Sequence, residues 1–277
     1  MINLGIVGYG FVGAAVEYGF KNNNIFIADP KLGTSCKDFL NIDLDIIFIC
    51  APTPMGKDGK IDSSIVESIL LDLEPINNIP IVLKSTVTPD LVEMFAEKYE
   101  NFIYNPEFLT ERNALNDFVN PIMHVFGGTI ENTAKLDEIY KKYSSCSKTE
   151  VFHMTAKEAS FVKYGVNTFL STKVLFWNQF NDICQKENVD YSKIIAAVGS
   201  DTRIGSSHTK VPGIDGRKGF GSACFAKDVP AFIEYSKNSN SEFSILNSVW
   251  NTNCDYRNGY PELLDREVEQ HVEFKKI

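Results

Sequence analysis

Residues 2–20 read INLGIVGYGFVGAAVEYGF, and this stretch decides the fold. A short apolar segment with strand character leads into three glycines spaced G-x-G-x-x-G, and an apolar helical stretch follows from Ala14 to Phe20. A strand, a tight glycine turn and a helix in this order form a dinucleotide-binding fingerprint. We therefore expect the turn to hold a pyrophosphate at a helix N-terminus, where free N–H groups and the helix dipole favour an anion.

Each glycine of the turn has its own task. The first permits the tight turn, the second lets the pyrophosphate approach the backbone, and the third lets the helix pack on the strand. The predicted cofactor-binding residues of this turn are Gly8, Tyr9, Gly10, Phe11, Val12 and Gly13.

A second apolar segment, residues 25–28, ends in Asp29. That position lies close to the ~20-residue offset at which a carboxylate binds the adenosine ribose hydroxyls. A carboxylate there repels a 2′-phosphate, so we expect NAD as the cofactor rather than NADP. Because Lys31 lies nearby, NADP is not excluded as the cofactor.

Length and composition indicate an ordinary globular protein. The chain has 277 residues, a length that predicts two domains. Of its residues, 44% are hydrophobic and 23% are charged, which is typical of a globular protein. The net charge of −9 and the lack of a basic stretch argue against a nucleic-acid partner. No apolar stretch is long enough to span a bilayer, and the N-terminus enters a strand directly, so we expect no membrane partner and no signal peptide.

The cysteines and histidines give no sign of a disulfide framework or a metal site. Six cysteines are scattered without a C-x-x-C pair, which favours a reduced, cytoplasmic location. The four histidines lack metal-ligand spacing, so we expect no metal.

Strands and helices alternate through the first half of the chain. This alternation predicts an α/β fold with an N-terminal Rossmann-like, doubly wound sheet over residues 1–154. Strand signals then fade, and residues 155–260 predict an all-helical central domain with one long helix over 156–186. Residues 261–277 form a charged tail that could be helical or frayed.

Ligands of a doubly wound sheet bind beyond the carboxyl ends of its strands. Several segments follow directly after predicted strands: residues 51–53, 85–86 and 105–107. We therefore add Pro52, Thr53 and Thr86 to the cofactor-binding residues.

Residues 219–228 read GFGSACFAKD and set Cys224 in a loop of small residues, with Lys227 and Asp228 close behind. A lysine near a thiol lowers its pKa and raises the fraction of nucleophilic thiolate. The aspartate is a candidate to position or deprotonate water. Alone, this cysteine could equally be a small buried hydrophobe.

These motifs, taken in order, resemble the UDP-glucose/GDP-mannose dehydrogenase family. The resemblance covers residues 1 to about 254 and rests on GYGFVG at 8–13, CAPTP at 50–54, KSTV at 84–87, NPEFLTE at 105–111, KxxxNTFL at 163–170, DTRIG at 201–205 and the cysteine loop.

The resemblance implies oxidation of a sugar C6 alcohol to a carboxylate, with two NAD+ and one water. It implies Cys224 as the nucleophile that holds the sugar as a thiohemiacetal and then a thioester. Lys163 and Asn167 are four apart, share one helix face and would stabilise the developing oxyanion. The family further implies Glu107 as the base for thioester hydrolysis, with Asp228 and Thr86 positioning the water.

The resemblance also implies residues that bind cofactor and substrate. Glu111 and Lys227 would contact the cofactor. In the family the arginine equivalent to Arg203 reaches the substrate of the adjacent subunit, which implies a homodimer built through the long helix. The basic pair Arg217 and Lys218 is expected at a substrate phosphate. The substrate-binding set is Phe108, Leu109, Lys163, Asn167, Arg203, Arg217, Lys218 and Gly221.

One departure from the family is length, because full-length members carry a C-terminal domain that grips the nucleotide. We expect residues 211–218 and the tail to replace its contacts, or the nucleotide to be held weakly. UDP-glucose is the expected substrate, and GDP-mannose or another nucleotide sugar is the nearest alternative. A non-catalytic NAD-binding relative and a two-electron hydroxyacid dehydrogenase, which would not need Cys224, stay open.

Overall fold

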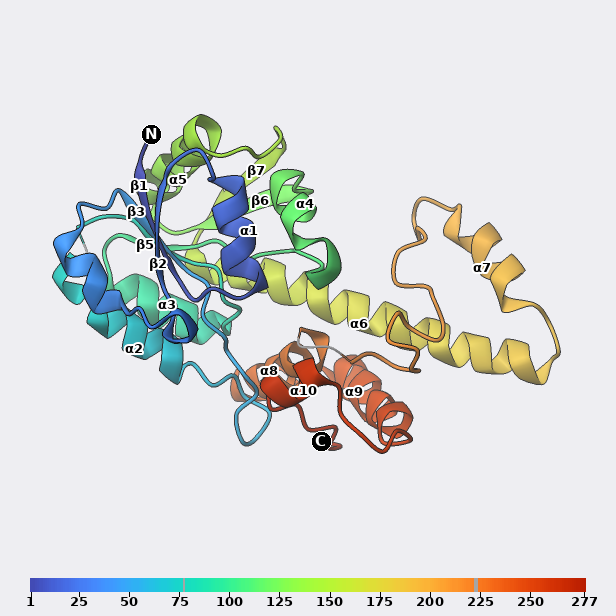
Figure 1. Cartoon of the computed structure of the whole chain (residues 1–277). Helices are drawn as coiled ribbons and strands as arrows, with labels where there is room; N and C mark the ends of the chain where they lie inside the picture. Colours follow the sequence, from blue (N-terminus) through green and yellow to red (C-terminus); the bar gives the residue numbers. More distant parts are fainter. Residues whose placement is uncertain (77, 222–223) are drawn as a thin grey trace. The chain divides into compact units, whose positions relative to one another are not determined.

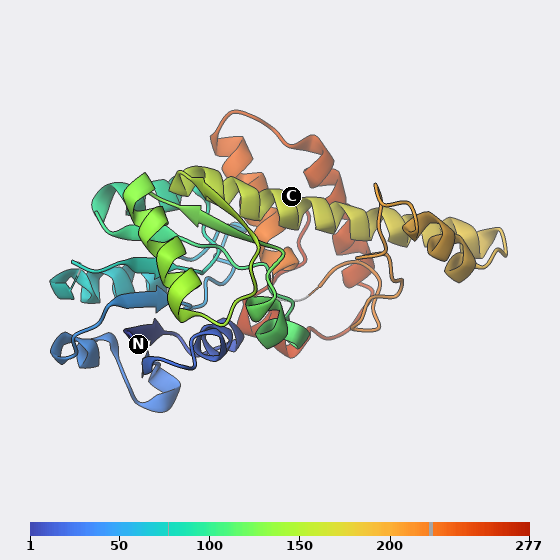
Figure 2. The same ribbon diagram turned by 90° about the horizontal axis from the view of Figure 1, so that it is seen from above.

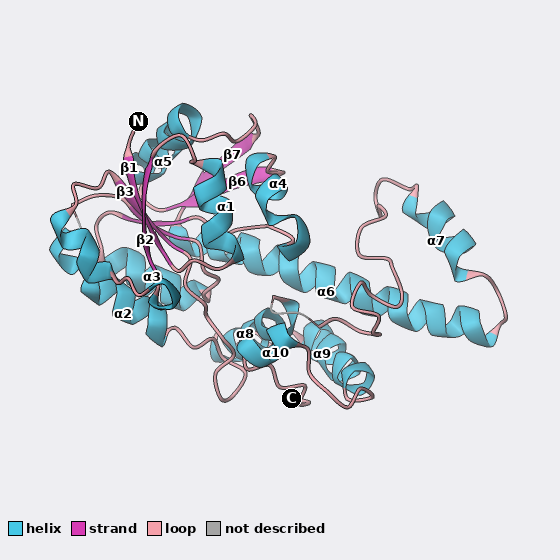
Figure 3. Ribbon diagram, in the orientation of Figure 1, coloured by secondary structure: helices cyan, strands magenta, loops and turns pink. Residues whose placement is uncertain are grey.

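The computed structural model describes residues 1–76, 78–221 and 224–277, and the chain forms two compact units. The first comprises residues 1–53 and 62–163, and the second comprises residues 54–61 and 164–277. All named strands lie in the first unit, whereas the described part of the second consists of helices, loops and one isolated bridge (Figure 3). The α/β class is confirmed. The units divide inside the long helix, and the domain boundary after residue 154 stays a prediction.

The first unit contains a seven-stranded sheet in the order β2-β1-β3-β4-β5-β6-β7. Its pairs are parallel except β5 with β6, where Tyr104 lies opposite Gly127. The apolar pattern did not predict this reversal, because a strand covered on both faces looks the same in either direction. The strands are β1 (Asn3–Val7), β2 (Asn24–Ala28), β3 (Ile46–Ile49), β4 (Ile81–Leu83), β5 (Phe102–Tyr104), β6 (Met123–Gly127) and β7 (Glu150–Met154).

Helices cover both faces of this sheet (Figure 1). One face packs against α1 (Phe11–Gly19), α4 (Ala114–Val119) and α5 (Ile130–Tyr143). There the ring of Phe20 lies 5.4 Å from that of Phe48 and 5.3 Å from that of Tyr140. On the other face are α2 (Ser64–Asp72) and α3 (Pro89–Lys98). Phe95 of α3 packs on Phe102 of β5. Short 3-10 helices are η1 (Pro30–Leu32), η2 (Cys36–Asn41), η3 (Glu74–Ile76) and η4 (Glu111–Asn113).

The long helix α6 (Ala156–Lys186) has the bounds that the sequence predicts, and it is continuous in two perpendicular views (Figures 1 and 2). It contains no proline, so its hydrogen-bond ladder is not interrupted. Its buried residues recur at helical spacing: Ala156, Ala159, Ser160, Lys163, Tyr164, Asn167, Thr168, Ser171, Leu175, Trp177, Asn178, Asn181 and Cys184.

The second unit adds α7 (Tyr191–Gly199), α8 (Phe225–Asn238), α9 (Ser244–Arg257) and α10 (Asp265–Glu269). The segment predicted as a tail packs into this unit. Its Glu267 and Val272 are buried, and the indole N–H of Trp250 donates to the carbonyl oxygen of Lys275 at 2.8 Å. None of the helices in the described ranges is long and apolar enough to cross a membrane.

Candidate active site

The glycine turn between β1 and α1 leaves room for a cofactor. Gly8 has a φ of +88°, and a Cβ there would lie 2.9 Å from the backbone nitrogen of Ala51. A Cβ at Gly13 would lie 2.2 Å from the carbonyl oxygen of Gly8, so neither position tolerates a side chain. A Cβ built at Gly10, in contrast, meets no atom of the described residues within 4 Å. This open space at the N-terminus of α1 fits a pyrophosphate.

Asp29 lies beside this turn and is held there by two backbone N–H groups. It is 8% exposed, and its Oδ2 accepts a hydrogen bond from the backbone N–H of Tyr9 at 2.6 Å. Its Oδ1 accepts from the backbone N–H of Lys31 at 2.7 Å. A carboxylate oxygen has two lone pairs, so each oxygen can still accept from a ribose hydroxyl.

The loops after β3 and β4 are joined by hydrogen bonds. The hydroxyl of Thr53 donates to the carbonyl oxygen of Thr86 at 2.8 Å, and that of Ser85 donates to the carbonyl oxygen of Ala51 at 2.6 Å. Pro52 is exposed next to them, and Glu111 is exposed in η4. The structure thus brings Thr53 and Thr86 together, as their places after neighbouring strands predict.

Glu107 and Lys163 form a buried ion pair in the first unit. Nζ of Lys163 lies 3.1 Å from Oε1 of Glu107 and donates to the carbonyl oxygen of Glu107 at 2.5 Å. Oε2 of Glu107 accepts from the backbone N–H of Leu109 at 2.7 Å, and the ammonium lies 5.4 Å from the ring centre of Phe108. The sequence suggested all four as site residues, and the structure places them in contact.

The sequence interpretation missed Lys84 and Asn105, which are both buried. Nζ of Lys84 donates to Oδ1 of Asn105 at 2.9 Å, and the hydroxyl of Tyr140 donates to the same oxygen at 2.8 Å. Burial lowers the pKa of Lys84 to about 8. These residues line a cavity of about 200 Å³ together with Glu107 and His124. The sequence signal for Lys84 was its position directly after the buried strand β4.

A second cluster lies around the N-terminus of α8, within the second unit. Cys224 is the N-cap residue and is half-buried, and its carbonyl oxygen accepts from the backbone N–H of Asp228 at 2.9 Å. The carboxylate of Asp228 is fully buried and accepts from the amide of Asn167 and from Nζ of Lys227, both at 2.6 Å. A thiolate at a helix N-terminus is stabilised by the helix dipole.

Three predicted basic contacts of the substrate bind groups of the protein itself. Arg203 has a largely exposed side chain and pairs with Asp201 at 2.6 Å. Arg217 donates to the carbonyl oxygen of Glu262 at 2.6 Å, and Lys218 pairs with Asp182 at 2.5 Å. Their role toward a substrate stays a prediction. The cysteine loop includes residues 222 and 223, which lie outside the described ranges.

A Rossmann-like unit with an open glycine turn, followed by a helical unit, is the architecture of a dinucleotide-binding protein. The chain belongs to the UDP-glucose/GDP-mannose dehydrogenase family, because the family's NAD binding domain matches residues 33–144 and its central domain matches residues 157–255. The resemblance in the sequence is thereby confirmed, and NAD is the cofactor that this domain indicates.

Known proteins show the same relationship. UDP-glucose 6-dehydrogenase TuaD of Bacillus subtilis is 34% identical over 221 residues, which are 76% of this chain and 46% of TuaD. The structure of a UDP-glucose dehydrogenase from Pyrobaculum islandicum matches with a TM-score of 0.79 at 27% identity, over 91% of this chain and 68% of that one. A 3-hydroxyisobutyrate dehydrogenase from Mycobacterium tuberculosis shares the fold alone, with a TM-score of 0.70 at 13% identity, over 99% of this chain and 97% of that one.

The chain spans about half the length of the curated relatives it matches. Their activity, substrates and assembly therefore enter only as proposals.

Proposed function

We propose that this protein oxidises UDP-glucose to UDP-glucuronate with NAD+, through a covalent intermediate on Cys224. The observation that carries the proposal is the cluster on α8. It places a half-buried cysteine at a helix N-terminus, one turn before a buried aspartate that binds Asn167 and Lys227. A protein that only binds NAD has no need for this combination.

NAD+ would bind against the first unit and supply the hydride acceptor, one NAD+ for each of the two oxidation steps. The glycine turn and Asp29 would hold its pyrophosphate and adenosine ribose. Pro52, Thr53, Thr86 and Glu111 would complete its site, and Lys227 would contribute from the second unit.

The first oxidation removes a hydride from C6 and passes the hydroxyl proton to solvent, which leaves an aldehyde. Lys163 and Asn167 are one turn apart on α6 and would donate to the oxygen on which negative charge develops. Loss of one such donor typically slows a reaction ~10²–10³-fold. The thiolate of Cys224 then adds to the aldehyde carbon and forms a thiohemiacetal.

The second oxidation removes a hydride from the thiohemiacetal and leaves a thioester on Cys224. Glu107 would take a proton from water, which attacks the thioester carbonyl and releases the thiolate and the sugar carboxylate. Asp228 and Thr86 would position this water. The covalent bond keeps a reactive aldehyde from escaping between the two oxidations.

For the nucleotide sugar we propose contacts from two segments. The 105–109 loop would contact the sugar through Phe108 and Leu109, and Gly221 would lie against it in the cysteine loop. Arg217 and Lys218 are supported by charge alone and would have to exchange their contacts with Glu262 and Asp182 for a phosphate.

We further propose a homodimer built through α6, with Arg203 reaching the partner's substrate. Phe169, Phe176 and Ile183 are spaced seven apart on the exposed side of this helix, with 68%, 56% and 59% of their surface accessible. Large apolar side chains in one stripe favour association. All six cysteines are free, which suits a cytoplasmic location.

The test is NADH release by the purified protein with UDP-glucose, GDP-mannose and UDP-N-acetylmannosamine in parallel. Two NADH per UDP-glucose, lost in Cys224→Ala and retained in the control Cys146→Ala, would support the proposal. The same stoichiometry with GDP-mannose alone would change the substrate and keep the mechanism. One NADH per substrate, unaffected by Cys224→Ala, would instead mean a two-electron dehydrogenase. NAD binding without turnover of any sugar would mean a binding role.

A further inference from the structure

Two buried asparagines hold the backbone of Gly219 and Phe220, upstream of Cys224. The N–H of Gly219 donates to Oδ1 of Asn178 on α6 at 3.0 Å. The N–H of Phe220 donates to Oδ1 of Asn253 on α9 at 2.7 Å, and the carbonyl oxygen of Phe220 accepts from the amide of Asn253 at 2.9 Å. Gly219 and Phe220 therefore take their position from two helices of the second unit.

A fully buried ion pair lies directly against the next residue, Gly221. A Cβ on Gly221 would be 2.2 Å from Oε1 of Glu267 and 2.3 Å from Nη2 of Arg257. These two atoms are themselves 2.5 Å apart, and neither side chain is accessible to solvent. The backbone of Gly221 thus rests on the contact between the guanidinium and the carboxylate, and glycine is required there by the protein's own packing.

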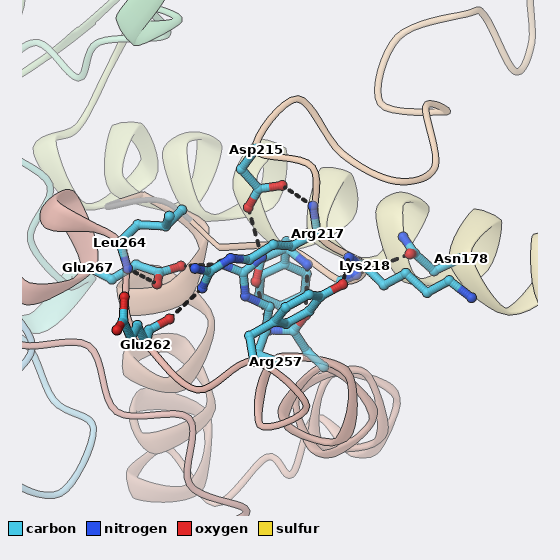
Figure 4. A network of polar contacts seen from close by, with 12 residues as sticks. Asn178, Asp215, Arg217, Lys218, Arg257, Glu262, Leu264 and Glu267 are labelled. Carbon is cyan, nitrogen blue, oxygen red and sulfur yellow. Dashed lines mark hydrogen bonds and ion pairs between the residues drawn. The ribbon is translucent and has the colours of Figure 1, made fainter.

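Further hydrogen bonds hold both partners of the pair (Figure 4). Nη1 of Arg257 donates to Oδ2 of Asp215 at 2.7 Å, upstream of the cysteine loop. Oε2 of Glu267 accepts from the backbone N–H of Leu264 at 2.8 Å. After α10, the carbonyl oxygen of Gln270 accepts from the N–H of Met55 at 2.9 Å, also within the second unit. The pair therefore links α9 and α10 to Asp215 and Gly221, the two ends of the segment 215–221.

Burying two charges costs more free energy than burying well-packed apolar side chains of similar volume. An ion pair does, however, fix geometry, because a guanidinium and a carboxylate bind each other in few orientations. A pair at this place would fix the loop three residues before the nucleophile.

We propose that Arg257 and Glu267 are positioning residues for Cys224: their ion pair holds Gly221 and so sets where the thiol stands at the start of α8. The inference rests on the proposed function, in which Cys224 is the nucleophile. Displacing a reacting group by about 1 Å can slow a reaction ~10²-fold, so even a small shift of the loop would be measurable.

The principal test compares Glu267→Gln with Glu269→Gln in the full chain. Both residues lie on α10, but Glu269 forms an exposed pair with Arg266. For each variant, NADH release gives kcat and the KM for NAD, and peptide mass spectrometry after brief iodoacetamide treatment gives the pH profile of Cys224 alkylation. We expect Glu267→Gln to lower kcat roughly 10- to 100-fold, to leave the KM for NAD nearly unchanged and to shift the alkylation profile. Glu269→Gln should behave as the wild type.

A milder variant covers the case in which Glu267→Gln does not fold. Asp215→Asn removes the charge and one acceptor oxygen of the outer, partly exposed partner of Arg257, and it should change kcat and Cys224 alkylation in the same direction, by less. Either variant with a lower melting temperature but wild-type kcat and wild-type Cys224 alkylation would overturn the inference. If the wild type oxidises no nucleotide sugar, the proposed function fails, and the alkylation profile alone still decides whether the pair positions Cys224.

Discussion

Asp29 is a residue whose two carboxylate oxygens are both occupied by backbone N–H groups and both still able to accept. Asp29→Asn would replace one oxygen by an amide nitrogen, which repels the N–H that it now binds. A hydrogen bond to a charged group is worth about 1.5–3 kcal/mol, so we expect NAD to bind at least ~10-fold more weakly.

Because the carboxylate also repels a 2′-phosphate, the preference for NAD over NADP should shrink in the same variant. Titration calorimetry with both dinucleotides measures this, with the exposed Asp43→Asn as the control. An unchanged ratio of the two Kd values would show that Asp29 does not face the ribose.

Lys84 makes stability depend on pH. Burial lowers its pKa to about 8 in the folded protein, whereas the ordinary value is 10.5. Between these values the unfolded chain binds a proton that the folded chain does not, so the free energy of unfolding rises with pH. The rise is about 1.4 kcal/mol for each pH unit of separation between the two pKa values.

Lys84→Met should remove this rise. Urea unfolding at a series of pH values from about 8 to about 10.5 tests it, because subtracting the variant's curve from that of the wild type cancels the groups that do not interact with Lys84. The exposed Lys135→Met should leave the curve unaltered. Parallel curves for the wild type and Lys84→Met would show that Lys84 keeps its ordinary pKa.

At the residue scale, the sequence was informative where a motif fixes the backbone. The glycine turn and Asp29 follow from spacing, and the structure gives each of them a steric or hydrogen-bonding reason. Lys84 and the Arg257–Glu267 pair were not predicted in this way, because the partners are 21 and 10 residues apart, spacings that belong to no motif used in the interpretation. The amide oxygen of Asn105 accepts hydrogen bonds from both Lys84 and Tyr140, and only the folded sheet brings these three side chains into contact.

Among the elements, α6 combines a buried face with a stripe of exposed aromatic and aliphatic side chains. Phe176→Asp places a charge in the middle of that stripe, so a dimer held by it should dissociate to monomers. Light scattering after gel filtration gives the mass, and NAD affinity should stay unchanged because the stripe is remote in sequence from the glycine turn.

Ile245→Asp is the matched control for this experiment, since Ile245 is a similarly exposed aliphatic residue on α9, with 63% of its surface accessible. It should not change the mass. A wild-type protein that is already monomeric, or a dimeric Phe176→Asp, would exclude the stripe as the interface.

The presence of a helix or strand was easier to predict than the direction in which a strand runs in the sheet. The bounds of α6 agree with the structure to the residue, because its apolar helical spacing has sharp ends. The antiparallel direction of β6 has no such local sign. It depends on the path of the chain through η4 and α4, which the apolar pattern did not predict.

For the molecule as a whole, the six cysteines should differ sharply in reactivity, because the thiolate is the reactive species. Burial raises the pKa of Cys36 to about 11 and the pKa values of Cys50 and Cys254 to about 12. Burial also raises the pKa of Cys146, and Cys184 is inaccessible.

We therefore expect brief iodoacetamide treatment near neutral pH to label Cys224 well before the other five cysteines. Peptide mass spectrometry at increasing times measures the order, and denatured protein, in which all six should react alike, is the control. Labelling of Cys50 or Cys146 at the same rate would contradict the expectation.

The hairpin of residues 54–61 has a consequence for protein synthesis. It leaves the ribosome early, yet Met55 binds Gln270 near the other end of the chain. The sheet strands can all pair once residue 154 has emerged, whereas this hairpin must wait for the last helix. Anyone who wishes to produce the helical unit alone must therefore graft residues 54–61 onto residues 164–277, because a simple cut inside α6 leaves it incomplete.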